Sequence, residues 1–260
     1  MSLTLKKLST AFILLFLPQV SLSATNPTLQ EGINAFQQGR YDQAEKSFQN
    51  LMSAPEWKFA ALYNLGNTAV RQNHLGQALG YYLRAARQNP HDRDTRENIK
   101  YVIGALGGRR LTSPPTNYDI FTNEVLDRLT FAEAMAGTFV FSIFFLLSLL
   151  RFLRGRKLDS TTAPPSTMLI TLVILVLFTA LSITKLIDTY TERGIVIVDH
   201  VDLRSGPSET NASMMEVAEG SEMSIRDSDH DWLQVNPVSG GLVGWIPRSS
   251  LMITSGGGPF

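Results

Sequence analysis

Two long apolar segments near the middle of the chain limit what the rest of it can fold into. Residues 134–150 carry no charged side chain, and residues 167–187 carry only Lys185. A helix needs about 20 mostly apolar residues to cross the hydrocarbon core of a bilayer. Neither segment shows the polar stripe of an amphipathic helix, and no other part of the chain could bury both in a soluble core. The sequence therefore predicts a transmembrane hairpin with helices over residues 132–153 and 167–187.

The segment between the two predicted membrane helices is strongly basic. Arg151, Arg154, Arg156 and Lys157 give it four cations in seven positions, whereas the outer flanks carry few. In membrane proteins the excess of Lys and Arg lies in cytoplasmic loops, close to the membrane. We therefore predict that residues 154–166 form a cytoplasmic loop, which places both larger parts of the chain on the opposite side of the bilayer.

Residues 1–24 have the pattern of an export signal. Two lysines precede a short apolar stretch, residues 8–17, and small residues follow it. This combination is typical of a secretory signal peptide. Cleavage after Ser23 or Ala24 and retention as an anchor both stay open, and either one exports the chain that follows.

The exported part, residues 25–108, begins with an internal repeat. Residues 25–58 and 59–92 align at an offset of 34, and four small or aromatic positions coincide: Gly32 with Gly66, Ala35 with Ala69, Ala44 with Ala78, and Phe48 with Tyr82. The period and the offsets resemble the tetratricopeptide repeat, an antiparallel helix pair. An apolar stripe over residues 93–107 predicts a capping helix after the two pairs. Because about three repeats are usually needed for stability, we expect an apolar edge of this array to pack on a partner protein.

The resemblance to tetratricopeptide arrays implies a concave groove, lined by the first helix of each repeat, that binds a protein segment. The residues expected in this groove are Leu29, Ile33, Phe36 and Gln37 in the first repeat and Tyr63, Asn67, Val70 and Arg71 in the second. Asn67 and Arg71 lie one helical turn apart and could hold a peptide backbone or carboxylate by hydrogen bonds. Solvated helix surface is the alternative for each of these side chains.

Residues 109–131 are predicted to connect this array to the membrane. A linker containing two prolines comes first. The apolar residues Leu126, Leu129 and Phe131 then suggest a short amphipathic helix. It would lie on the same membrane that the hairpin crosses, on the side opposite the cytoplasm.

After the second apolar segment, the hydrophobic period changes to that of a β-strand. Short alternating stretches separated by turn residues over 193–254 predict a small all-β barrel. Three stretches resemble the bacterial SH3-like family: residues 203–208 (LRSGPS), 231–235 (DWLQV) and 244–246 (GWI). Trp232 and Trp245 are expected to form its ligand platform for peptide or glycan, with packing in the core as the alternative. Residues 255–260 form a glycine-rich tail without a predicted structure.

No motif in the sequence predicts an active site or a cofactor. The chain has no cysteine, and its four histidines are scattered over different units. Residues 227–231 imitate the start of a calcium loop, but Trp232 and Val238 stand where such a loop requires Gly and Glu. The chain has 23 basic and 23 acidic residues, so no basic surface favours nucleic acid. We predict a non-enzymatic protein.

The order of these parts resembles the BatE proteins of the Bacteroides-aerotolerance (Bat) operon family. The resemblance implies a scaffold in the bacterial inner membrane with both ends in the periplasm. Its implied partners are other Bat-type membrane proteins with von Willebrand A domains and a MoxR-type ATPase, in a complex for envelope stress. Two further functions stay open: an envelope sensor whose SH3-like domain binds peptidoglycan peptide or glycan, and a regulatory subunit of a cell-wall enzyme.

Overall fold

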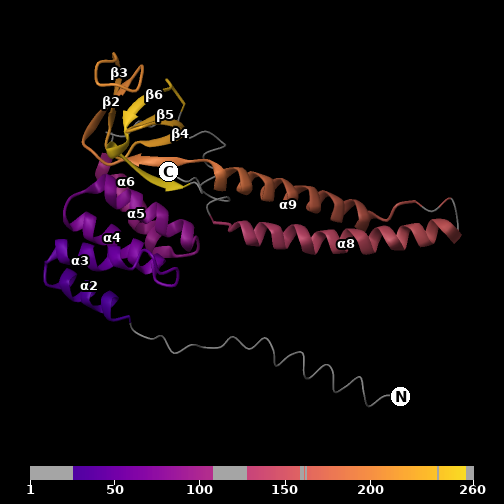
Figure 1. Ribbon diagram of the computed structural model, residues 1–260. Coiled ribbons are helices and arrows are strands. Elements are labelled where there is room, and N and C mark those ends of the chain that lie inside the picture. Colours follow the sequence, from indigo (N-terminus) through magenta and orange to yellow (C-terminus); the bar gives the residue numbers. More distant parts are fainter. Residues whose placement is uncertain (1–25, 108–127, 159–160, 162, 239, 256–260) are drawn as a thin grey trace.

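The computed structural model describes residues 26–107, 128–158, 161, 163–238 and 240–255 (Figure 1). Within these residues the chain has seven α-helices and one antiparallel sheet of seven strands. Five helices form an amino-terminal array, two long helices form a hairpin, and the strands follow. This layout confirms the prediction of a multidomain chain with separate helical and β parts. The predicted signal peptide and most of the predicted linker over 109–131 lie outside the described residues.

The amino-terminal array contains the same structural unit twice. Its helices are α2 (Pro27–Gln37), α3 (Tyr41–Asn50), α4 (Lys58–Arg71), α5 (Leu75–Gln88) and α6 (Arg93–Leu106). One contact recurs in both pairs, since a Cβ at Gly32 would lie 2.5 Å from Cε1 of Phe48, and a Cβ at Gly66 would lie 2.5 Å from Cε1 of Tyr82. At both positions the aromatic ring of the second helix occupies the space beside the first, as the aligned positions predict.

The ends of these helices follow from local sequence. Asn26 caps α2, because its Oδ1 accepts a hydrogen bond of 2.9 Å from the amide of Thr28. The turns inside the two pairs reverse at equivalent positions, Gly39 with φ +75° and Asn73 with φ +63°. These are residue types that adopt the left-handed conformation at low cost. By contrast, α5 begins without a cap from its own sequence.

The two apolar segments form α8 (Phe131–Leu158) and α9 (Ser166–Tyr190), which lie side by side and extend away from the rest of the chain (Figure 1). Both are long and apolar enough to cross a membrane, as predicted. Many of their Phe, Leu, Ile and Val side chains are exposed on the outside of the hairpin. Exposure of so many apolar side chains to water would be unfavourable, so their position fits contact with lipid.

Small residues and hydroxyl groups hold the hairpin together. The ring of Phe178 on α9 lies against Gly137 of α8, where a Cβ would clash with it. Thr138 Oγ1 and Ser182 Oγ lie 3.0 Å apart and share a hydrogen bond between the helices. Close approach at small residues and hydrogen bonds between polar side chains are the usual means of helix association in a membrane.

Helix α8 ends later than the sequence suggested. It continues to Leu158, so part of the segment predicted as a loop from residue 154 onward is helical. Arg, Leu and Lys are good helix formers, and the Arg156 guanidinium lies 5.9 Å from the centre of the Phe152 ring. A 28-residue helix is about 42 Å long, which exceeds the roughly 30 Å of a hydrocarbon core.

The carboxyl-terminal part is one antiparallel sheet. Its strands are β1 (Arg193–Val196), β2 (His200–Arg204), β3 (Ser213–Ala218), β4 (Glu222–Asp229), β5 (Trp232–Pro237), β6 (Gly244–Pro247) and β7 (Leu251–Ser255), in the order β3-β2-β6-β5-β4-β1-β7. Alternate side chains of these strands form an apolar core that includes Leu203, Val217, Met223, Leu233, Val235 and Ile246. The change of hydrophobic period after α9 therefore marks a β unit, as predicted.

The sheet packs against the helical array, although the hairpin separates the two in sequence (Figure 1). Helix α5 contacts strands β1 and β7. Ile195 of β1 is fully buried in one apolar cluster with Leu79 of α5 and Leu106 of α6. The apolar edge that was expected to pack on a partner protein is thus covered in part by the chain's own sheet. Sequence patterns identify such an edge but do not show which distant segment covers it.

Each membrane helix is attached to a different part of this array–sheet unit. Only two residues separate α9 from β1. Arg193 at the start of β1 lies 3.1 Å from Asp188 of α9 and 3.7 Å from Glu222 of β4, through its two terminal nitrogens. At the start of α8, Glu133 lies 2.9 Å from the ring of His91, in the turn between α5 and α6. The sheet is therefore joined to α9 and the array to α8.

Candidate binding surfaces

The predicted groove residues on α4 mainly contact neighbouring helices. The Tyr63 ring lies 6.4 Å from that of Phe59 and 6.1 Å from that of Tyr82, measured between ring centres. Asn67 Oδ1 accepts a hydrogen bond of 2.6 Å from the hydroxyl of Tyr82 and a longer one of 3.4 Å from Asn98. Burial raises the pKa of the Tyr82 phenol well above its usual value, so the hydroxyl stays protonated and remains a donor. The Asn67 carbonyl is consequently engaged inside the array.

Arg71 and Asn67, which were expected to act together, point to different neighbours. The Arg71 guanidinium lies 5.5 Å from the centre of the Tyr41 ring, at the start of α3. Val70 packs in the cluster around Tyr82. Arg71 is exposed, so its charge remains accessible from solvent.

The groove residues of the first repeat divide in the same way. Leu29, Ile33 and Phe36 are half-buried and pack against the core of the first helix pair. Gln37, at the last position of α2, is exposed. The apolar positions thus hold the first pair together, with only part of each side chain open to a ligand.

A line of side-chain amides on the first helices was not predicted from the sequence. Gln30 of α2, Asn64 of α4 and Asn98 of α6 lie at successive 34-residue offsets. Each amide nitrogen donates within the array, to Asn34 Oδ1 (3.1 Å), Ala60 O (2.8 Å) and Asn67 Oδ1 (3.4 Å) respectively. Each of these amides also has a carbonyl oxygen that can accept a hydrogen bond. Extending the repeat into α6 would have identified this line from the sequence.

One buried carboxylate forms a hydrogen bond across the interface between the array and the sheet. Glu219 lies in the turn between β3 and β4, and its side chain is almost completely buried. Its Oε1 accepts a hydrogen bond of 2.6 Å from the amide of Gly76, in the first turn of α5. A carboxylate at a helix N-terminus satisfies an unpaired N–H group and stabilises the helix by about 1 kcal/mol. The cap that α5 lacks in its own sequence therefore comes from the sheet.

Glycines on both sides allow the array and the sheet to approach closely. A Cβ at Gly76 would lie 2.7 Å from the backbone oxygen of Val196, and one at Gly80 would lie 2.5 Å from Sδ of Met252. From the side of the sheet, Gly220 has φ +77°, and a Cβ there would lie 2.5 Å from Leu106 of α6. A larger residue at Gly76 would meet backbone of β1, whereas at Gly80 and Gly220 it would meet the ends of the Met252 and Leu106 side chains, which would have to move.

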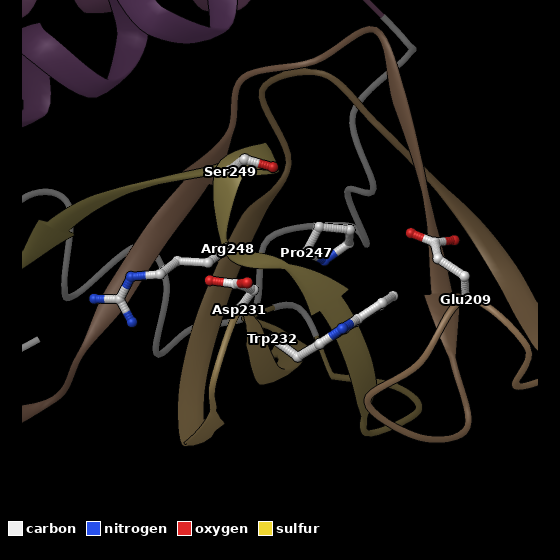
Figure 2. A pocket seen from close by; sticks show the side chains of 6 residues that line it. All are labelled: Glu209, Asp231, Trp232, Pro247, Arg248 and Ser249. Carbon is white, nitrogen blue, oxygen red and sulfur yellow. The ribbon is translucent and has the colours of Figure 1, made fainter.

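The sheet carries a pocket of about 530 Å³ at one of the two predicted tryptophans. Figure 2 shows the residues that line it: Glu209, Asp231, Trp232, Pro247, Arg248 and Ser249. They come from the β2–β3 loop, the β4–β5 turn, β5, β6 and the short 3-10 helix that follows β6. Trp245 is not among them. It is half-buried on β6, opposite Gln234 of β5 and two residues before Pro247, so it shares a face of the sheet with Trp232 but does not line the pocket.

The segment that imitates a calcium loop lies in a β-hairpin. Asp229, the last residue of β4, pairs with Trp232, the first of β5, and His230 in the turn between them has φ +50°. Among the residues that the structure describes, no group of three or more His, Cys, Asp or Glu side chains could hold a metal ion.

Comparison of the chain with protein-family models, with curated proteins and with solved structures found no match.

Proposed function

We propose that this chain is a non-enzymatic membrane scaffold whose helical array and sheet act as one binding unit on a single side of the membrane. The observation that carries this proposal is the buried hydrogen bond between Gly76 and Glu219, together with the apolar cluster around Ile195. Two parts that share a buried interface must lie in the same compartment. The chain between them must therefore cross the membrane an even number of times, which agrees with a hairpin of two spanning helices.

The basic end of α8 supports the direction of this hairpin. Arg151, Arg154, Arg156 and Lys157 lie at the end of the hairpin that is remote from the sheet and are exposed. By the rule that basic residues stay in the cytoplasm, the array–sheet unit lies outside the inner membrane, in the periplasm. A signal peptide over residues 1–24 would export the array to the same side.

The proposal includes the finer assignments of the two folded parts. The array is a pair of tetratricopeptide repeats with a capping helix, which the recurring contacts of Gly32 and Gly66 support. The sheet over 193–254 is an SH3-like domain, supported by its short antiparallel strands and the position of Trp232. With the membrane hairpin between them, these parts support a BatE-like scaffold that works with other Bat-type membrane proteins and a MoxR-type ATPase.

The line of amides is where the array would hold a partner. Carbonyl oxygens of Gln30, Asn64 and Asn98 offer regularly spaced acceptors for the N–H groups of an extended peptide. Half-buried aromatic rings, such as that of Tyr63, lie on the same helices and supply apolar contact. We therefore expect the partner to contribute an extended segment.

Replacing Asn64 and Asn98 by alanine is expected to weaken capture of the partner. Chemical cross-linking of intact membranes, followed by mass spectrometry, would identify the proteins held by the wild-type chain. Loss of one or two hydrogen bonds to a ligand costs about 1–3 kcal/mol, which is roughly 5- to 150-fold in affinity. Gln49→Ala, which removes an exposed amide from α3, is the matched control and should leave capture unchanged. Equal recovery with both variants would contradict a role of the amides, and a wild-type chain that recovers no protein would contradict the scaffold.

The pocket at Trp232 favours a second function, that of an envelope sensor whose sheet binds peptide or glycan of the cell wall. An open pocket with an indole in its wall is a suitable surface for either ligand. Sedimentation of the detergent-solubilised chain with purified peptidoglycan tests this function. A chain that serves only as a scaffold stays in the supernatant.

A further inference from the structure

We infer that the pocket beside Trp232 binds a cationic side chain, an ammonium or guanidinium group carried by a peptide. This inference rests on the second function proposed above and names the chemistry of its ligand. The six residues that line the pocket support this inference, because they combine an apolar wall with carboxylates from two separate loops.

Trp232 and Pro247 provide the apolar wall. They occupy directly opposite positions on the neighbouring strands β5 and β6, so their side chains share one face of the sheet. Both are half-buried, which leaves part of each ring open to the pocket. The face of an indole attracts a cation, and the alkyl stem of a lysine or arginine packs well on such rings.

Glu209 supplies a carboxylate in a fixed position. The β2–β3 loop that carries it is held by Arg204, which donates hydrogen bonds of 2.8 Å and 2.9 Å to the backbone oxygens of Glu209 and Asn211. Arg204 also lies 3.1 Å from the Glu209 carboxylate and 3.2 Å from that of Asp202. Its single positive charge is thus shared between two acidic side chains. A loop that is ordered before binding saves entropy when the ligand arrives.

Asp231 brings a second carboxylate from the β4–β5 turn. The turn is fixed by a hydrogen bond of 2.8 Å from the amide of Arg248 to the backbone oxygen of Asp231. Asp227 and Asp229 precede it on β4, so this end of the sheet is rich in negative charge. The nearby cation Arg226 is held by Asn236 through a hydrogen bond of 2.8 Å.

Arg248 is the one basic residue among the six, and its orientation limits its effect. Figure 2 shows its guanidinium group directed away from Trp232 and Glu209. Arg204 is paired with Glu209 and Asp202 together, so acidic side chains still outnumber arginines at this end of the sheet. This excess of negative charge beside an aromatic wall favours an ammonium or guanidinium group over a neutral sugar or an acidic group.

A pair of peptides that differ only in one charge tests the inference. The probes are acetyl-Gly-Lys-Gly-amide and the same peptide with its lysine side chain acetylated. Binding to the full chain in detergent is followed by tryptophan emission at low and high salt. We expect saturable binding of the lysine peptide, at least about tenfold weaker binding of the acetylated one, and weakening by salt. Equal affinity for both peptides, or no saturable change with the lysine peptide, would overturn the inference.

Variants of the pocket give a second test. Glu209→Gln combined with Asp231→Asn should lower the affinity for the lysine peptide by at least about tenfold, while Trp232 remains as the reporter. Glu216→Gln on β3, which removes an exposed carboxylate that does not line the pocket, is the control and should keep the affinity. If the chain binds peptidoglycan but not the lysine peptide, the cationic ligand is wrong and the sensor function stands. If the chain binds neither peptidoglycan nor the lysine peptide, the sensor function and the cationic ligand are both wrong.

Discussion

Replacing Gly76 by alanine is expected to loosen the sheet from the helical array and to destabilise the folded unit by about 2–4 kcal/mol. The new Cβ would lie 2.7 Å from Val196 O and 2.7 Å from Cγ of Glu219. Backbone cannot rotate away as a side chain can, so β1 must move. The movement breaks the hydrogen bond between Glu219 and Gly76 and exposes apolar surface around Ile195. Thermal unfolding of the full chain in detergent and hydrogen exchange of α5 and β1 measure both effects.

Gly104→Ala is the matched control for this experiment. Gly104 lies in α6, and no atom lies within 4 Å of the position that its Cβ would take. Alanine in an open helix position is expected to stabilise the chain by up to about 1 kcal/mol. A Gly76→Ala chain that is as stable as the Gly104→Ala chain, with α5 equally protected from exchange, would contradict the interface.

Replacing Gly66 by alanine is expected to destabilise the second helix pair by about 1–3 kcal/mol, even though alanine favours helix. The Cβ would lie 2.5 Å and 2.6 Å from two carbons of the Tyr82 ring. This ring is buried and its hydroxyl is bonded to Asn67, so it has little room to move. The unfolding temperature of the chain in detergent should fall.

The equivalent substitution Gly32→Ala tests whether the two units are true repeats. Its Cβ would meet the Phe48 ring at the same 2.5 Å, and its effect should be of the same sign. A fall in unfolding temperature for one variant and a rise for the other would show that the aligned positions differ in packing.

Much of this fold could be predicted because its signals are local or periodic. Long, almost uncharged runs of mostly apolar side chains predict most of α8 and α9, and the 34-residue offset places Gly32 and Gly66 at equivalent helix crossings. The strands follow from alternation. Each of these patterns lies within a few dozen residues of the chain.

The contact between the array and the sheet has no such signal. Gly76 and Glu219 are 143 residues apart, and neither is distinguished from an ordinary helix or turn residue by its neighbours in sequence. For the same reason, the sequence did not separate Trp232, which lines a pocket, from Trp245, which lies across from Gln234. Both tryptophans lie on the same face of β5 and β6, and the loop residues that line the pocket, such as Glu209 and Asp231, distinguish Trp232 from Trp245.

The central claim, that the array and the sheet share one compartment and one interface, can be tested by a disulfide. The chain has no cysteine, and a Cβ at Gly80 would lie 3.5 Å from Cβ of Met252, within the range of disulfides. We expect Gly80→Cys and Met252→Cys in the same chain to be cross-linked by mild oxidation of intact membranes, with the linked peptides detected by mass spectrometry. The pair Gly104→Cys and Met252→Cys should give no intramolecular link. Failure of residues 80 and 252 to link under conditions that oxidise a control protein in the periplasm would contradict the shared interface.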